Sequence, residues 1–109
     1  MTGLATKRCR PHGPGEAPYA DVQARALLTQ LEGWTLEDGR LVKTYRFRNF
    51  HETMAFVNAH AWISHREDHH ADLEVGYDRC RVAYATHSIG GLSENDFICA
   101  AKSDALFRL

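Results

Sequence analysis

The chain has 109 residues, enough for one hydrophobic core and therefore one domain. Its 13 basic and 14 acidic residues give a formal net charge of -1, without the basic surface that non-specific nucleic-acid binding requires. No apolar run approaches the roughly 18 residues of a membrane helix. We therefore expect a globular protein that binds neither nucleic acid nor membrane.

The three cysteines, Cys9, Cys80 and Cys99, are widely spaced and form no C-x-x-C pair. An odd number of scattered cysteines favours reduced thiols over a disulfide framework. The first eighteen residues also lack the apolar segment of a secretory signal. These features predict a cytoplasmic protein with free thiols.

The first eighteen residues differ in composition from the rest. They contain all three prolines, Pro11, Pro14 and Pro18, and they show no apolar periodicity. Such a segment is typical of a loop or linker. We predict that residues 1–18 form a flexible N-terminal arm and that residues 19–109 form a single folded domain.

A helix and a β-hairpin are predicted next. The helix begins at Asp21, the expected N-cap, and ends before Gly33; its apolar face consists of Ala24, Leu27, Leu28 and Leu31. Asp38-Gly39 then suits a two-residue turn in which both residues have positive φ. In that register Glu37 pairs with Arg40, and Leu36 pairs with Leu41.

A long helix, a second hairpin and a third helix complete the chain. The long helix opens at Asn49 or Phe50 and runs to about Asp68, with a predicted apolar stripe on Phe50, Met54, Val57 and Ala61. Residues 73–77 and 80–87 alternate as two strands around a turn near Asp78-Arg79. Ser93 and Asp96 resemble a capping box that opens the last helix.

The predicted order is α-β-β-α-β-β-α. Two hairpins with interspersed helices indicate an α+β fold, with a four-stranded antiparallel sheet and three helices packed on one face.

Histidines are concentrated in one part of the chain, since five of the seven lie between residues 51 and 70. His69 and His70 end the long helix and His87 ends a strand, so imidazoles from two elements could meet at one site. The C-terminus of a helix also favours a protonated imidazole. We expect the remaining candidates, His12, His51 and His60, to be surface polar residues or hydrogen-bonding neighbours.

A zinc site is the alternative interpretation of these histidines. His65 and His69 are four residues apart and would project from one helical face, with His87 as a third ligand. The acidic residue is not at the second position, as it is in H-E-x-x-H. A zinc-dependent hydrolase therefore stays a less favoured alternative, and we expect no metal.

Three segments together resemble the pterin-4a-carbinolamine dehydratase family: Asp68-His69-His70-Ala71-Asp72, Thr86-His87, and Gly-Gly-Leu-Ser-Glu-Asn-Asp-Phe over 90–97. The likeness covers about residues 20–105, and the predicted order of elements agrees with the fold of that family. Ala71 is a departure, since the family usually has proline after the histidine pair. Alanine leaves this turn less rigid than proline would.

The resemblance implies a hydro-lyase that converts 4a-hydroxytetrahydropterin to quinonoid dihydropterin and water. The pterin is the substrate, and no cofactor is implied. The implied roles are acid and base for His69 and His87, and substrate positioning for His70. The implied pterin-binding residues are Asp68, His69, His70, Ala85, Thr86, His87 and Ser88.

The resemblance also implies partners. The reaction recycles the pterin cofactor of aromatic amino acid hydroxylases, so a functional link to such a hydroxylase is expected. Relatives are homodimers or homotetramers, and we expect the same here. Some relatives also serve as dimerisation partners of a transcription factor, so an interaction module is the alternative function.

Overall fold

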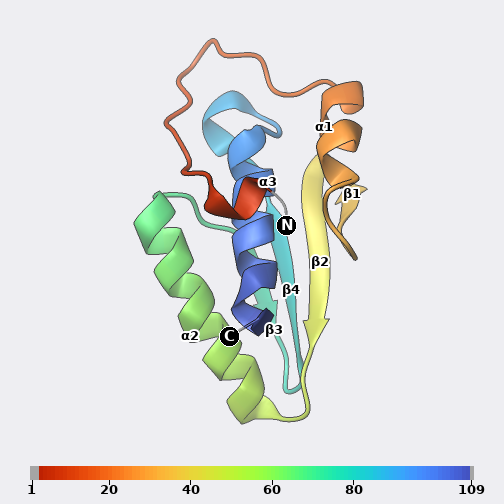
Figure 1. Cartoon of the computed structure of the whole chain (residues 1–109), viewed down its shortest axis with the longest axis vertical. Helices are drawn as coiled ribbons and strands as arrows, with labels where there is room; N and C mark the ends of the chain where they lie inside the picture. Colours follow the sequence, from red (N-terminus) through yellow and green to blue (C-terminus); the bar gives the residue numbers. More distant parts are fainter. Residues whose placement is uncertain (1–2, 109) are drawn as a thin grey trace.

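The computed structural model describes residues 3–108 (Figure 1). Met1 and Thr2 of the predicted arm, and Leu109 of the predicted domain, lie outside the described residues. The α-helices are α1 (Asp21–Leu28), α2 (Phe50–Glu67) and α3 (Glu94–Ala105). The strands are β1 (Thr35–Glu37), β2 (Arg40–Arg46), β3 (Asp72–Val75) and β4 (Arg79–Tyr84). Short 3-10 helices span Leu4–Thr6, His87–Ile89 and Leu106–Arg108.

The strands form one antiparallel sheet in the order β1-β2-β4-β3. The helices lie on one face of this sheet (Figure 1). The predicted α+β architecture is therefore confirmed. None of the helices within residues 3–108 has the length and apolar character needed to span a bilayer.

The first hairpin has the predicted turn and register. Asp38 has φ of 51° and Gly39 has φ of 76°, and β1 pairs Glu37 with Arg40 and Leu36 with Leu41. Pairing between β2 and β4 then sets Leu41 opposite Tyr84. Both of these side chains are fully buried. The turn thus fixes which residues of the sheet enter the core.

A side-chain cap marks the start of α2, whereas the N-cap residue of α1 has no side-chain hydrogen bond to the helix. Asn49 caps α2 as expected, because its side chain accepts a hydrogen bond from the Glu52 N–H at 2.9 Å. The first helix differs from the prediction, since its N-cap is Ala20 rather than Asp21 and it ends at Leu28. Asp21 occupies the first turn instead, where an acidic residue is also favourable.

The buried face of α2 matches the predicted apolar stripe only in part, since Val57 packs against the core but the ends of the stripe do not. Phe50 and Ala61 are exposed, and the buried residues are Thr53, Phe56, His60 and Glu67. Three of these four are polar, and hydrogen bonds make their burial possible. Thr53 Oγ1, for example, donates to the carbonyl of Tyr77 at 2.9 Å. Hydropathy alone misplaced part of this face, because it does not count polar groups whose partners are elsewhere in the fold.

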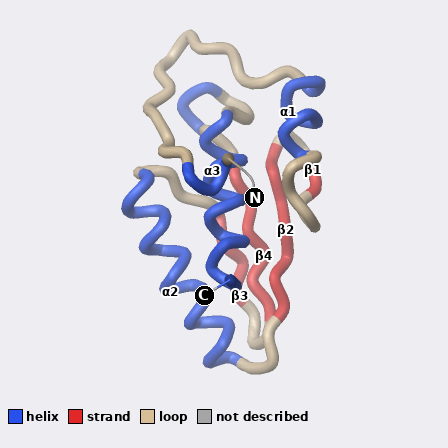
Figure 2. The backbone as a smooth tube through the Cα atoms, viewed as in Figure 1, coloured by secondary structure: helices blue, strands red, loops and turns tan. Residues whose placement is uncertain are grey.

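Part of the N-terminal segment, for which the sequence predicts a flexible arm, contacts the domain between residues 4 and 10. Leu4 is 2% exposed and belongs to the hydrophobic core. The Cys9 N–H donates to Glu67 Oε1 at 2.8 Å, and the Arg10 N–H donates to Asn95 Oδ1 at 3.1 Å. Figure 2 shows the loop crossing the end of the molecule toward α1. Single anchors of this kind leave no periodic pattern in the sequence.

His60 is a buried hydrogen-bonding residue, not a surface one. It is 1% exposed, and its Nε2 lies 2.8 Å from the Tyr84 hydroxyl. Burial lowers the pKa of His60 to about 4. In the unfolded chain the pKa of histidine is about 6.5. Between pH 6.5 and 4, His60 is therefore protonated in the unfolded chain and neutral in the folded protein.

Stability should fall as the pH drops from 6.5 toward 4, because protonation of His60 then favours the unfolded chain. Between pH 7.5 and 5 the wild-type protein should lose about 2 kcal/mol more free energy of unfolding than His60→Phe does. Urea denaturation at both pH values measures this difference. The exposed His51 supplies the control, since His51→Phe should keep the wild-type pH dependence. An equal pH dependence in His60→Phe and wild type would contradict the assignment.

Candidate active site

Asp96, in the first turn of α3, joins three parts of the chain. Its side chain is 0% exposed. Its Oδ2 accepts hydrogen bonds from the Ser93 N–H at 3.0 Å and from Thr86 Oγ1 at 2.8 Å, and its Oδ1 lies 2.7 Å from His69 Nε2. The predicted capping box is therefore present. The same carboxylate also binds a predicted catalytic histidine, a role that sequence reasoning missed.

The ring of His69 is held on two sides. Its side chain is 11% exposed, and Nε2 is engaged by Asp96. The ring also stacks on Tyr84, with centroids 5.8 Å apart and planes 6° apart. When Nε2–H donates to Asp96, the neutral ring leaves Nδ1 as an acceptor for a ligand.

The turn after α2 separates the two adjacent histidines. Asp68 takes the left-handed conformation with φ of 50° and ψ of 43°, which aspartate tolerates better than most residues. The helix therefore stops at Glu67, and the chain changes direction before His69. His69 is turned inward and partly buried, whereas His70 is exposed.

Thr86 follows β4 and lies beside Asp96, to which its hydroxyl donates a hydrogen bond. Its backbone pairs with Gly91 in an isolated bridge, and its hydroxyl lies 2.7 Å from Ser93 Oγ. Residues 87–89 form a short 3-10 helix between the two ends of this bridge, and the chain leaves that helix at Gly90 with φ of 70°. His87 and Ser88 are exposed on this turn.

A cavity of about 450 Å³ lies between these elements. The C-terminal end of α2 and the N-terminal end of α3 lie at the same end of the molecule, which the N-terminal loop crosses (Figures 1 and 2). Four predicted residues line the cavity: Asp68, His69, Thr86 and Ser88. Three others do not: His70, Ala85 and His87. The roles of these three stay predictions.

Sequence reasoning did not find several residues of the cavity wall: Cys9, Arg10, Pro11, His12, Arg66, Glu67 and Asn95. Glu67 is buried and forms a 2.9 Å ion pair with Arg8. Burial pushes the pKa of Glu67 upward, but the Cys9 N–H and the charges of Lys102 and Arg8 outweigh it and lower the pKa overall. Nothing in the local sequence of the N-terminal segment indicates this contact.

His65 and His69 have different partners in the structure. His65 stacks on Trp62, with ring centroids 5.5 Å apart, whereas His69 binds Asp96. Within residues 3–108, no three His, Cys, Asp or Glu side chains are grouped so that they could hold a metal ion. His65 and His69 therefore do not belong to a common set of zinc ligands in the described part of the chain.

Comparison with known proteins gives consistent matches. The family described as pterin 4 alpha carbinolamine dehydratase matches residues 17–106. A Nitrosomonas europaea protein named "Putative pterin-4-alpha-carbinolamine dehydratase" is 58% identical over 106 residues, covering 96% of this chain and 94% of its own.

Two solved structures share the fold. The transcriptional coactivator/pterin dehydratase from Brucella melitensis has a TM-score of 0.79 at 27% identity, covering 82% of this chain and 97% of its own. A pterin dehydratase-like RuBisCO assembly factor of the alpha-carboxysome has a TM-score of 0.56 at 24% identity, covering 67% of this chain and 84% of its own. On the family match and the 58% identical relative, the chain belongs to the pterin-4-alpha-carbinolamine dehydratase family and is a hydro-lyase of that type.

Proposed function

We propose that the protein dehydrates a 4a-hydroxytetrahydropterin to the quinonoid dihydropterin in the cavity beside His69. The contact between His69 and the buried Asp96 carries this proposal. An imidazole held by a carboxylate can give and take protons near neutral pH. The cavity also has the size range of small-molecule sites, at about 450 Å³.

The chemistry requires two proton transfers. The bond from C4a to the hydroxyl oxygen breaks, and an acid supplies the proton with which that oxygen leaves as water. A base removes the proton from N5, and the N5 electrons form the new bond to C4a. No electrons enter or leave the substrate, so we propose that the pterin is the substrate and that no cofactor takes part.

We propose His69 and His87 as the acid and base. Asp96 would orient the His69 ring and stabilise the positive charge of its protonated form. His87 is exposed next to the lining residue Ser88, so we place it at the mouth of the cavity. His70, which follows His69, would position the substrate there.

The pterin would be held by the polar groups that line the cavity. Asp68 supplies a carboxylate, and Thr86 and Ser88 supply hydroxyls. These groups complement the N–H donors and the carbonyl of a reduced pterin. Recycling of the pterin for an aromatic amino acid hydroxylase in the cytoplasm is the role that we propose for this reaction.

An interaction module is the second candidate function. It is favoured by large apolar side chains that the structure leaves exposed, including Phe50, Trp62 and Tyr77. The structural neighbour from Brucella melitensis is described as a transcriptional coactivator as well as a pterin dehydratase. An association role would use these surfaces and would not need the His69–Asp96 contact.

The protein should form a homodimer or homotetramer. Phe50 and Tyr77 stack on each other at 6.5 Å while both are exposed, and β3 is an edge strand of the sheet. Association would cover such surfaces. Multi-angle light scattering at micromolar concentration should therefore give a mass at least twice that of one chain. A monomeric mass alone would contradict the expectation.

His69→Ala and His87→Ala should each lower kcat by about 10²- to 10⁴-fold, the usual effect of removing a general acid or base. His70→Ala should raise KM more than it lowers kcat. Stopped-flow dehydration of chemically prepared carbinolamine measures all three variants. His51→Ala, which changes an exposed histidine of α2, is the control and should keep wild-type rates.

The double variant and a chelator test the same assignment in other ways. If His69 and His87 act as a unit, the loss in the double variant should be smaller than the product of the single losses. Full activity of the double variant would overturn the roles of both histidines. A metal chelator should leave the rate unchanged, and chelator-sensitive activity would favour the zinc alternative.

Asp96→Asn should affect both stability and rate. The amide oxygen can still accept from Ser93 and Thr86, but the amide N–H then faces His69 Nε2, so the charge is lost and the His69 ring has to take the other neutral tautomer. We expect a loss of about 1–3 kcal/mol in the free energy of unfolding and a lower kcat. Urea denaturation and the stopped-flow assay measure the two effects. Asp21→Asn, on the surface of α1, is the matched control; the same behaviour in both variants would argue against the role of Asp96.

A further inference from the structure

The N-terminal segment forms one wall of the cavity beside His69. Four consecutive residues, 9–12, line it together with Asp68, His69, Thr86 and Ser88. This wall comes from the segment that sequence composition assigned to a flexible arm.

Side chains of the domain hold this wall in place by its backbone. The side chain of Asn95 binds both backbone polar groups of Arg10. Its Oδ1 accepts from the Arg10 N–H at 3.1 Å, and its Nδ2 donates to the Arg10 carbonyl at 2.7 Å. Glu67 accepts from the Cys9 N–H at 2.8 Å. The Cys9 and Cys99 sulfur atoms also lie 3.5 Å apart. Residues 9 and 10 are therefore held in place, and only Pro11 separates them from His12.

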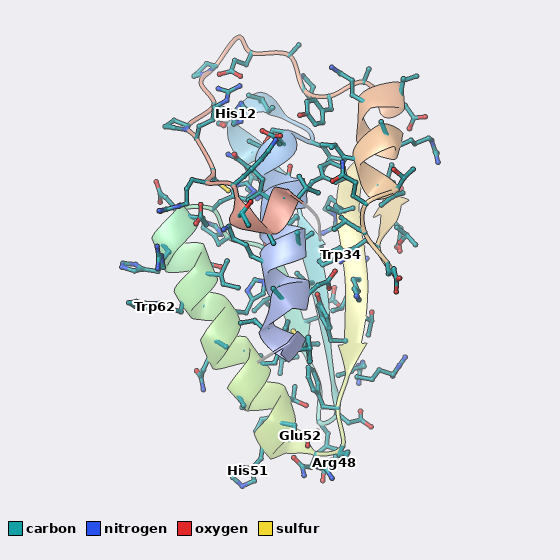
Figure 3. All side chains as sticks on the ribbon, viewed as in Figure 1. His12, Trp34, Arg48, His51, Glu52 and Trp62 are labelled. Atoms are coloured by element: carbon teal, nitrogen blue, oxygen red, sulfur yellow. The ribbon has the colours of Figure 1, made fainter. Side chains whose placement is uncertain are left out.

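His12 is buried in this wall with one ring nitrogen unpaired. Its side chain is only 6% exposed. Nδ1 lies 2.8 Å from Glu16 Oε2, whereas Nε2 is buried and has no hydrogen-bond partner among residues 3–108. A buried nitrogen without a partner is unfavourable and rare in folded proteins. Figure 3 labels His12 on the loop at the end of the molecule opposite His51.

Glu16 decides what the free nitrogen can do. A carboxylate only accepts hydrogen bonds, so Nδ1 carries the proton that it donates to Glu16. This contact with His12 is also the main reason why the pKa of Glu16 is lowered. In the neutral ring, Nε2 then has a lone pair and accepts a hydrogen bond. His12 lines the cavity, so this unpaired acceptor lies within the wall of a cavity whose proposed substrate carries several N–H donors.

We propose that residues 9–12 are part of the pterin site and that His12 Nε2 binds the substrate directly by accepting a hydrogen bond from one of its N–H groups. This inference rests on the proposed dehydration. It adds a substrate-contacting residue from outside the three family motifs at residues 68–72, 86–87 and 90–97. His12 supplies ground-state binding in this assignment and takes no part in the proton transfers.

Three variants separate hydrogen bonding from packing. His12→Phe keeps a ring of similar shape but removes both nitrogens. His12→Gln keeps a polar group that can reach the position of Nε2. His51→Phe makes the same chemical change at the exposed histidine at the other end of the molecule (Figure 3). Thermal unfolding of each variant checks that the fold is intact.

In the stopped-flow carbinolamine assay, His12→Phe should raise KM about three- to tenfold, the effect of one lost hydrogen bond. Its kcat should stay within about twofold of wild type. A contact that is equally strong in the bound substrate and in the transition state changes KM but not kcat. His12→Gln should recover most of the lost affinity, and His51→Phe should match wild type. Wild-type KM in His12→Phe, or the same rise in His12→Phe and His12→Gln, would overturn the inference.

A binding measurement on the wild-type protein tests the contact without turnover. With ¹⁵N-labelled histidine, addition of 7,8-dihydrobiopterin should shift the His12 Nε2 resonance and leave the His51 resonances unchanged; the spectrum of His12→Gln assigns the signal. An unshifted His12 Nε2 at saturating pterin would overturn the inference. Failure of the wild-type protein to accelerate dehydration would instead count against the proposed function, and the titration would still decide whether His12 contacts a pterin.

Discussion

The buried carboxylate of Asp96 is the interaction on which the rest of the site depends. One side chain caps α3, fixes Thr86 at the end of the sheet and holds His69 after the end of α2. A fully buried charge is unfavourable unless several hydrogen bonds satisfy it. The hydrogen bonds that stabilise the buried Asp96 carboxylate therefore also hold together the end of α2, the end of β4 and the start of α3.

Two further buried polar contacts extend this arrangement. His60 of α2 meets the Tyr84 hydroxyl at 2.8 Å, and Tyr84 is also the ring on which His69 stacks. Glu67 fixes the last turn of α2 to the N-terminal segment through Arg8 and the Cys9 N–H. Polar pairs of this kind specify one packing of the helix, because a rotated helix would leave each group without its partner. The orientation of His69 therefore depends on the packing of the whole long helix.

The cavity is lined on one side by residues at the ends of helices and strands and on the other by residues 9–12. This second side is an irregular segment held by Asn95 and Glu67. This division suits a dehydration in which few groups do the proton chemistry and the others bind the substrate. The family relationship supports the reaction type, and the geometry around His69 supplies a physical basis for it.

The sequence by itself determined the fold class, the first hairpin register and the caps at Asn49 and Ser93, because these depend on local spacing and turn chemistry. The family motifs also named four residues that line the cavity: Asp68, His69, Thr86 and Ser88. Only the tertiary structure decided the buried face of α2, the second role of Asp96 and the position of His12. His12 has its own partner, Glu16, only four residues away, but residues 9 and 10 hold this segment against the domain through Glu67 and Asn95. In all three cases the placement of a polar side chain depends on contacts between residues distant in sequence, and neither hydropathy nor periodicity records such contacts.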